Sequence, residues 1–382
     1  MKDRALRAFL CCLPILVGFG CAGTNGGHPR GNLMIAGGAT SAENEGVYSR
    51  FVSSLPPDAT IGVLPTASGV PEESAASSAA TLKKYAGSRQ VKIIDITTKT
   101  PERASIPAFV KQIEECRGLW FTGGDQSRII ATFRPASGDT PGFAAARRIV
   151  ELGGNVGGTS AGAAMMSDPM IIGGSSEDAL SGKFRSQTGD SGFDFGKGMG
   201  FFEYGLTDQH FLRRGRFGRL VVALERAGLK RGYGIEENCA LEVNCETGRL
   251  TAIGPVPAVV VIDISGAKLE AGAHGGIRLS LLCDGDTVDG KSGTVQPLDA
   301  RKPVAKVGAP RTEPMPEAWS NGALTQAIRA LAATPDRPVE LRSKAFAVRV
   351  SADARTRFFS DVRVPDRLTA LEVRLDIVPA TP

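Results

Sequence analysis

The pentapeptide Gly-Thr-Ser-Ala-Gly at residues 158–162 is the feature that most constrains the fold of this chain. It follows a short strand-like run that contains Val156 and precedes a small apolar run that ends at Met166. This order favours a sharp turn from a strand into a helix, in which the serine hydroxyl is exposed and the next backbone N–H can bind an oxyanion. Glycines suit such a turn because a side chain would collide where the backbone doubles back. An ordinary glycine-rich turn can carry the same letters, so assigning Ser160 as a nucleophile requires a base and an orienting acid.

The region from residue 32 to residue 298 reads as an α/β fold. Short apolar runs such as residues 61–64 alternate with helix-like stretches such as residues 71–85. Buried parallel strands have this continuous apolar character and are joined by crossover helices. Ligands of such sheets bind at the carboxyl ends of the strands. Two candidate sites fall there, namely residues 122–126 (Thr-Gly-Gly-Asp-Gln) and Ser160.

The candidate base is one of only three histidines in the chain. His28 lies in a glycine-rich stretch that reads as a linker, and His274 lies in a turn-like Ala-His-Gly-Gly, where we expect a solvated loop residue. His210 lies in Thr-Asp-Gln-His-Phe-Leu, which is rich in hydrogen-bonding side chains. A serine hydrolase needs a base whose pKa is near neutrality, which favours His210 over the alternative of a structural histidine.

The orienting acid is expected downstream of His210, in a turn that enters a strand and contains Glu236 and Glu237. Adjacent residues of a strand face opposite sides, so only one of the two carboxylates can point at the imidazole. That carboxylate would fix the tautomer of the base and stabilise the imidazolium. A solvated acidic turn is the alternative.

Four arginines follow the histidine, at positions 213, 214, 216 and 219, where the pattern predicts the first turns of a helix. Cations at a helix N-terminus oppose the macrodipole, at a cost of about 0.3–1 kcal/mol each. We therefore interpret the cluster as a patch that recognises anions, because guanidinium groups bind carboxylates in a bidentate manner. An ordinary basic face is the alternative.

The ends of the chain predict export. Residues 1–20 have the basic start, apolar run and small-residue end of a bacterial signal peptide. Cys21 is a candidate lipidated first residue, and residues 21–31 read as a linker. Proline recurs in a linker at 299–318, and residues 319–382 are predicted to form a small α+β extension of unknown role. We expect a periplasmic, outer-membrane or extracellular protein.

Charge and cysteine content exclude several classes of function. The formal net charge of +5 is diffuse and comes without a basic tract, so nucleic-acid binding gains no support. Beyond the leader, the cysteines form no C-x-x-C pair and have no histidine nearby, which argues against a zinc site. Whether any disulfide forms stays open, and neither a metal nor a cofactor is implied. These cysteines are Cys116, Cys239, Cys245 and Cys283.

Taken together, the motifs resemble those of the cyanophycinases, members of the serine peptidase family that also includes the α-aspartyl dipeptidases. The resemblance covers roughly residues 32–298 and is carried by four segments. These are Phe-Thr-Gly-Gly-Asp-Gln at 121–126, Gly-Gly-Thr-Ser-Ala-Gly-Ala at 157–163, Asp-Gln-His-Phe at 208–211 with its arginines, and Gly-Ile-Glu-Glu at 234–237.

The resemblance implies a triad of Ser160 as nucleophile, His210 as base and Glu237 as orienting acid, with Glu236 as the less favoured acid. It also implies a three-layer α/β/α sandwich with a mostly parallel sheet, similar to class I glutamine amidotransferases, and a homodimer. The implied substrate is cyanophycin, a poly-aspartate with arginine on each β-carboxyl group, which an exopeptidase would cut to β-Asp-Arg dipeptides. An oxyanion hole is implied at Gly123, Gly124 and Ala161, and a substrate pocket at Gln126, Asp208, Gln209, Arg214, Arg216 and Arg219, with Asp208 facing the substrate guanidinium.

Two alternatives remain open at this point. Loops near the site can redirect specificity, and residues 181–200 form a glycine-rich stretch of that kind. The chain could thus be a related isoaspartyl or acidic dipeptidase with the same triad. It could also be a non-catalytic lipoprotein that binds peptides, although a binder has no need to keep the serine, histidine and glutamate.

Overall fold

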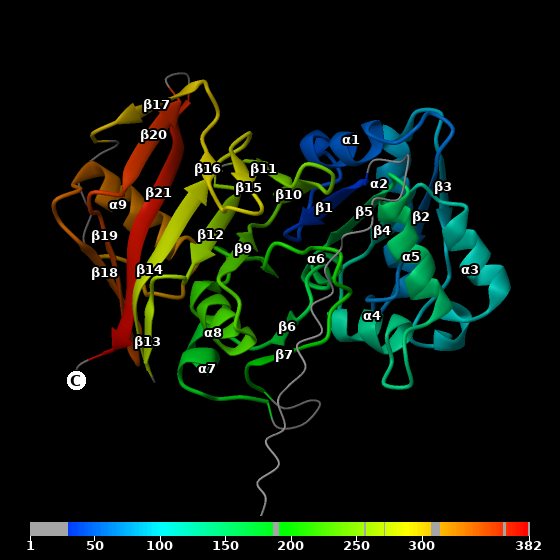
Figure 1. The fold of residues 1–382 in the computed structure, drawn as a ribbon, viewed down its shortest axis with the longest axis horizontal. Helices are drawn as coiled ribbons and strands as arrows, with labels where there is room; N and C mark the ends of the chain where they lie inside the picture. Colours follow the sequence, from blue (N-terminus) through cyan, green and yellow to red (C-terminus); the bar gives the residue numbers. More distant parts are fainter. Residues whose placement is uncertain are drawn as a thin grey trace, which may run out of the picture.

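The computed structural model describes residues 30–185, 191–255, 257–270, 272–306, 314–361 and 364–380. The expected signal peptide, the candidate lipidation site Cys21 and His28 lie outside these residues. Two large sheets lie side by side, with the C-terminal strands on the far side of the second sheet from the first (Figure 1).

The first sheet is mixed rather than mostly parallel. Strands β1, β5, β4, β2 and β3 pair in parallel, as the alternation of apolar runs and helices predicted. Strands β10, β11, β15 and β16 extend it as antiparallel neighbours, and short turns join β10 to β11 and β15 to β16. In spatial order the strands are β16 (Val295–Gln296), β15 (Thr287–Asp289), β11 (Arg249–Ile253), β10 (Ala240–Asn244), β1 (Asn32–Ala36), β5 (Asn155–Thr159), β4 (Gly118–Phe121), β2 (Thr60–Leu64) and β3 (Gln90–Ile93).

Helices cover both faces of the parallel half of this sheet. Alternate residues of β1 point to opposite faces, so Met34 packs with one group of helices while Leu33 and Ile35 pack with the other. Helices α1 (Glu45–Ser53) and α2 (Pro71–Ala86) lie on the first face. The second face carries α3 (Pro107–Glu114), α4 (Gln126–Phe133) and α5 (Pro141–Glu151), and a 3-10 turn spans Pro101–Ala104.

The second sheet joins the middle of the chain to its C-terminal end. Helices α7 (Ser176–Leu180), α8 (Phe217–Ala227) and α9 (Ala323–Ala333) pack with its apolar core. Strand β13 (Lys268–Glu270) pairs with β14, and β18 (Val339–Arg342) and β19 (Phe346–Ser351) pair with each other and, through β19, with β21. In spatial order its main strands are β17 (Arg301–Val304), β20 (Arg357–Asp361), β21 (Val364–Pro379), β14 (Ala273–Leu282), β12 (Val259–Asp263), β9 (Arg231–Ile235) and β8 (Leu206–Gln209).

The expected boundary at residue 298 therefore does not separate two sheets. Strand β21 pairs antiparallel with β14, whose edge would otherwise be left unpaired. The expected linker contains β17 and is fixed by a fully buried ion pair between Arg301 and Asp286. Asp286 also accepts a hydrogen bond from the Thr369 hydroxyl. The described strands of the expected extension, β18 to β21, thus belong to the second sheet.

The two sheets meet in a shared core and are linked by the turn between β9 and β10. Tyr233 and Ile235 of the second sheet belong to the same apolar cluster as Leu241 and Leu250 of the first. Near this junction, α6 (Ala161–Ala164) follows β5, and β6 (Met170–Gly173) pairs with β7 (Asp194–Gly196). Among the described residues, no helix is both long enough and apolar enough to cross a membrane.

Candidate active site

Ser160 lies on a sharp turn between β5 and α6, as the pentapeptide predicted. Its backbone has φ 54° and ψ −107°, a conformation that residues with side chains seldom adopt. The Ser160 N–H donates to the carbonyl of Ala36 at the end of β1, which fixes the turn to the sheet. Strain of this kind is typical of functional positions.

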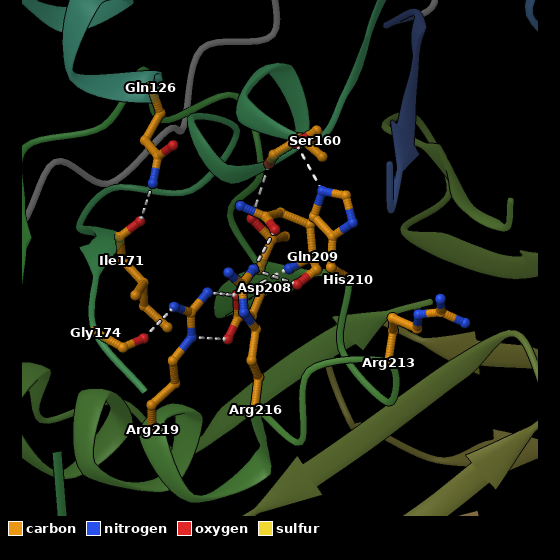
Figure 2. Close-up of polar contacts among 12 residues, drawn as sticks. Gln126, Ser160, Ile171, Gly174, Asp208, Gln209, His210, Arg213, Arg216 and Arg219 are labelled. Carbon is orange, nitrogen blue, oxygen red and sulfur yellow. Dashed lines mark hydrogen bonds and ion pairs between the residues drawn. The ribbon is translucent and has the colours of Figure 1, made fainter. Parts of the chain in front are cut away.

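The three predicted triad residues form one hydrogen-bonded chain. The Ser160 hydroxyl lies 2.8 Å from His210 Nε2 (Figure 2). His210 Nδ1 lies 2.6 Å from Glu237 Oε1. With the carboxylate accepting from Nδ1–H, the neutral imidazole presents Nε2 as the acceptor for the serine proton. The His210 side chain is only 9% exposed, whereas that of Glu237 is 25% exposed.

His210 is held by the glycine turn that follows β1. Its N–H donates to the Gly37 carbonyl at 2.8 Å. The imidazole lies directly on Gly38, where an added Cβ would come within 2.5 Å of Nε2. Sequence reasoning did not include Gly37 and Gly38 in the site, although a Gly-Gly pair directly after a strand is a signal of close backbone approach.

Glu237 is fixed by asparagines that the sequence analysis also missed. The Asn44 side-chain amide, which caps α1, donates to the carbonyl of Asn238 at 2.8 Å. The Asn238 N–H in turn donates to the Gly38 carbonyl at 2.8 Å. The turn that carries Glu237 is thereby tied to the turn under His210, so acid and base keep a constant spacing.

The electrostatic surroundings of His210 favour its neutral form. Burial is the largest influence and lowers its pKa below the ordinary value of 6.5, and the positive charges of Arg214 and Arg216 lower it further. The hydrogen bond to Glu237 acts in the opposite direction without outweighing burial. The imidazole is therefore uncharged at neutral pH and ready to accept a proton.

Glu236, the alternative acid, points away from the imidazole. Its Oε2 accepts backbone hydrogen bonds from Leu212 and from Arg213, the latter at 2.9 Å. Burial raises the pKa of its carboxyl group, and these backbone N–H groups oppose that rise. Glu236 thus holds residues 211–216, here called the arginine loop, while its neighbour Glu237 holds the histidine.

The predicted oxyanion-hole residues lie around Ser160. Ala161 is the first residue of α6, directly after the serine. Gly123, in the turn after β4, lies against Ser160, because a Cβ there would be 3.9 Å from the hydroxyl oxygen. Gly124 follows it and packs on the carbonyl of Ala67.

Gln126 is buried, and its amide nitrogen donates to the backbone of a neighbouring strand. Its Nε2 donates to the carbonyls of Ile171 at 2.8 Å and Ile172 at 2.7 Å, both in β6 (Figure 2). Gln126 is therefore bonded to the backbone of β6.

Asp208 and Arg219 form a closed, buried pair, which corrects two expectations. Their side chains are only 1% and 2% exposed, and Arg219 Nε donates to Asp208 Oδ2 at 2.8 Å while Nη2 donates to Oδ1. Arg219 Nη1 also donates to the Gly174 carbonyl at 2.6 Å. The Asp208 carboxylate does not face outward to meet a substrate guanidinium, and the Arg219 guanidinium does not face solvent, because both side chains are buried and bonded to each other.

Gln209 and Arg216 form the next layer towards the surface. Arg216 Nη1 donates to the Gln209 carbonyl at 2.6 Å and to its side-chain oxygen, and lies 3.7 Å from Asp208 Oδ1. Burial and the nearby Arg219 lower the pKa of Arg216 to about 9, so the guanidinium remains protonated at neutral pH.

Only the outermost arginines are exposed. Helix α8 begins at Phe217, so Arg213 and Arg214 lie in the loop before it and not in its first turn as predicted. Neither guanidinium has a hydrogen-bond or ion-pair partner within the described ranges. The single anion-binding patch expected from the sequence is thus divided into a buried half and an exposed half.

The remaining histidine and the cysteines lie away from this chemistry. His274 is not a solvated loop residue, because it is buried in β14 with Nε2 3.1 Å from Glu225 Oε2. Cys116, Cys239, Cys245 and Cys283 are free and buried, so none forms a disulfide. The described part of the chain contains no cluster of three His, Cys, Asp or Glu side chains arranged for a metal ion.

Comparisons with known proteins identify the family of this chain. Residues 33–251 match the sequence profile of peptidase family S51. A cyanophycinase of Geminocystis herdmanii is 28% identical over 284 residues, which is 70% of this chain and 96% of the relative. A cyanophycinase of Synechococcus elongatus is 32% identical over 247 residues, covering 63% of this chain and 72% of the relative.

Among solved structures, a peptidase from an acI-B1 Actinobacterium superimposes with a TM-score of 0.50. The two chains are 19% identical, and the match covers 69% of this chain and 98% of the other. At that identity the likeness concerns the fold alone.

Proposed function

Because the chain belongs to peptidase family S51, we propose that it is a serine peptidase that hydrolyses cyanophycin and releases β-Asp-Arg dipeptides. The observation that carries this proposal is the unbroken chain of short hydrogen bonds from the Ser160 hydroxyl through His210 to Glu237. The cyanophycinase relatives support the choice of substrate.

In the proposed mechanism, Ser160 attacks the scissile carbonyl while its proton passes to Nε2 of His210. The lowered pKa of His210 keeps the imidazole neutral before the attack, and Glu237 stabilises the imidazolium formed in it. The backbone N–H groups of Ala161 and of the Gly123–Gly124 turn would bind the oxyanion.

The second half of the reaction reverses these roles. His210 gives its proton to the leaving amine, which departs and leaves an ester between Ser160 and the acyl part of the substrate. Water, deprotonated by His210, then attacks the ester and restores the free hydroxyl.

Substrate carboxylates would be bound by the exposed part of the arginine loop. Arg213 and Arg214 are exposed beside the catalytic histidine, and a carboxylate-rich polymer complements their charge. The buried polar residues would support the site indirectly, by fixing β6 and the base of the arginine loop. These residues are Gln126, Asp208, Gln209, Arg216 and Arg219.

The test is the release of soluble dipeptide from insoluble cyanophycin granules by the purified protein and by Ser160→Ala. We expect release of β-Asp-Arg, identified by its mass, by the wild type alone. Equal release by both proteins would remove Ser160 as nucleophile. Inertness towards granules with turnover of isoaspartyl dipeptides would favour the dipeptidase, and granule binding without any release would favour a peptide-binding lipoprotein.

We also propose export, with residues 1–20 removed as a signal peptide and Cys21 acylated. The composition of these residues supports it. The N-terminal mass of the mature protein, compared with that of Cys21→Ser, tests both points. A homodimer and a three-layer core of the glutamine amidotransferase type are further proposals, and the mass in sedimentation equilibrium tests the dimer.

A further inference from the structure

The C-terminal part of the chain reaches back to the arginine loop. Residues 317–322, here called the Trp319 segment, directly precede α9 and lie beyond the residues that match the family profile. The segment is anchored in the second sheet, because the Ala318 N–H donates to the Arg342 carbonyl in β18 at 2.9 Å. It also contacts the arginine loop, which follows His210.

The backbone of the Trp319 segment packs closely on that loop. The Gly322 N–H donates to the Leu212 carbonyl at 3.3 Å. Gly215 has φ 54° and lies so close that an added Cβ would be 2.6 Å from the carbonyl carbon of Trp319. The opposite side of the loop is held by Glu236, which accepts the Leu212 N–H. Leu212 is therefore fixed at its N–H and at its carbonyl by two different parts of the chain.

The Trp319 side chain adds a third connection. Its indole ring packs on Phe217, the first residue of α8, with 4.9 Å between ring centroids, and on Phe346 of β19 at 6.5 Å. The indole N–H donates to Glu177 of α7 at 2.8 Å. The ring thus connects the start of α8 with the short helix α7 and with the C-terminal strands of the second sheet.

We propose that the Trp319 segment is a positioning element of the active site, which holds the arginine loop and thereby keeps His210 aligned with Ser160. The inference rests on the proposed function, because it assigns a catalytic consequence to the alignment. The C-terminal extension carries no recognisable motif. In this proposal it supports catalysis by residues that lie within the part of the chain that matches the family profile. Trp319 contacts no reacting atom and acts only through the loop.

The experiment compares Trp319→Ala and Trp319→Phe in the full-length chain. Phe358→Ala is the control, because Phe358 is a buried aromatic of the apolar cluster on which Trp319 packs, and it lies in β20. Two measurements are made on each folded variant: amide hydrogen exchange of peptides that cover residues 211–216, and kcat and KM for release of β-Asp-Arg from cyanophycin.

We expect Trp319→Ala to speed exchange in residues 211–216 and to lower kcat/KM by about 10- to 100-fold, since a displacement near 1 Å has effects of that size. Trp319→Phe keeps the ring packing and should restore most of both values. Phe358→Ala should lose comparable thermal stability while leaving both values near those of the wild type.

Unchanged exchange in residues 211–216, or faster exchange with unchanged kcat/KM, would overturn the proposal, as would an equal loss of activity in Phe358→Ala. The exchange measurement needs no substrate, whereas the proposed function is judged by wild-type and Ser160→Ala turnover. A failure of one is therefore distinguishable from a failure of the other.

Discussion

The imidazole of His210 rests directly on Gly38, so that a single added carbon at position 38 would lie 2.5 Å from Nε2. The glycine belongs to the turn after β1, more than a hundred residues before the histidine in the sequence. The absence of a side chain at position 38 therefore helps to position His210, the proposed base, together with the hydrogen bonds that it makes.

Gly38→Ala should displace the imidazole from Ser160. We expect kcat/KM for dipeptide release to fall by about 100-fold or more, because catalysis tolerates little misplacement of the base. Gly266→Ala is the control, since a Cβ there meets no atom within 4 Å. A Gly38→Ala enzyme with the wild-type rate would show that His210 can act from another position.

The pH dependence of kcat/KM should reflect the lowered pKa of His210. Activity requires the neutral imidazole, so it should persist below pH 6.5 and disappear only as the pH falls through the lowered pKa of the free enzyme. Removing the positive charge in Arg214→Gln should raise this pKa and move the acidic limb to higher pH. The quantity to compare is the pH at which kcat/KM falls to half its maximum, not the maximum itself. If this pH were the same in Arg214→Gln and the wild type, the charge of Arg214 would not lower the pKa of His210.

The adjacent glutamates should respond differently to the same substitution. Glu237→Gln replaces the acceptor that selects the tautomer of His210, and kcat should fall by about 10³- to 10⁴-fold, by analogy with the triad of other serine proteases. Glu236→Gln keeps an oxygen that can accept from Leu212 and Arg213, so its kcat should stay within about tenfold of the wild type, as expected for a positioning group that retains its hydrogen bonds. If the two effects were reversed, Glu236 would be the orienting acid.

The buried Asp208–Arg219 pair should matter for folding more than for substrate contact. Asp208→Asn leaves the Arg219 charge buried without its partner, and we expect the free energy of unfolding in urea to fall by about 3–5 kcal/mol. Arg214→Gln, at an exposed position, should change it by no more than about 0.5 kcal/mol. A stable Asp208→Asn protein with a raised KM would show instead that Asp208 meets the substrate guanidinium.

The residues of the proposed triad could be identified from sequence because each lies beside a strand end and carries a local signal. The Gly-Thr-Ser-Ala-Gly turn marks Ser160, and the polar run around His210 marks the base. A local pattern also limited the acid to Glu236 or Glu237, and the structure distinguishes them by their contacts with Leu212 and His210.

Burial and long-range pairing could not be predicted in the same way. The arginines at 214, 216 and 219 look equivalent in sequence. Arg219 nevertheless lies in α8 and closes on Asp208, whereas Arg214 lies in the loop before this helix and stays exposed. The C-terminal strands looked like an independent addition, since the partner edge of β21 lies about a hundred residues earlier in the chain.

The origin of the triad residues has a mechanical consequence. Ser160 follows a strand of the first sheet, His210 follows β8 of the second, and Glu237 lies in the turn that passes from one to the other. A displacement of one sheet relative to the other would separate the Ser160 hydroxyl from the His210 imidazole, while the hydrogen bonds between the strands of each sheet stayed intact. On warming, turnover should accordingly disappear at a temperature several degrees below that at which the far-ultraviolet circular dichroism changes. Loss of activity would then indicate movement between the two sheets before either sheet unfolds.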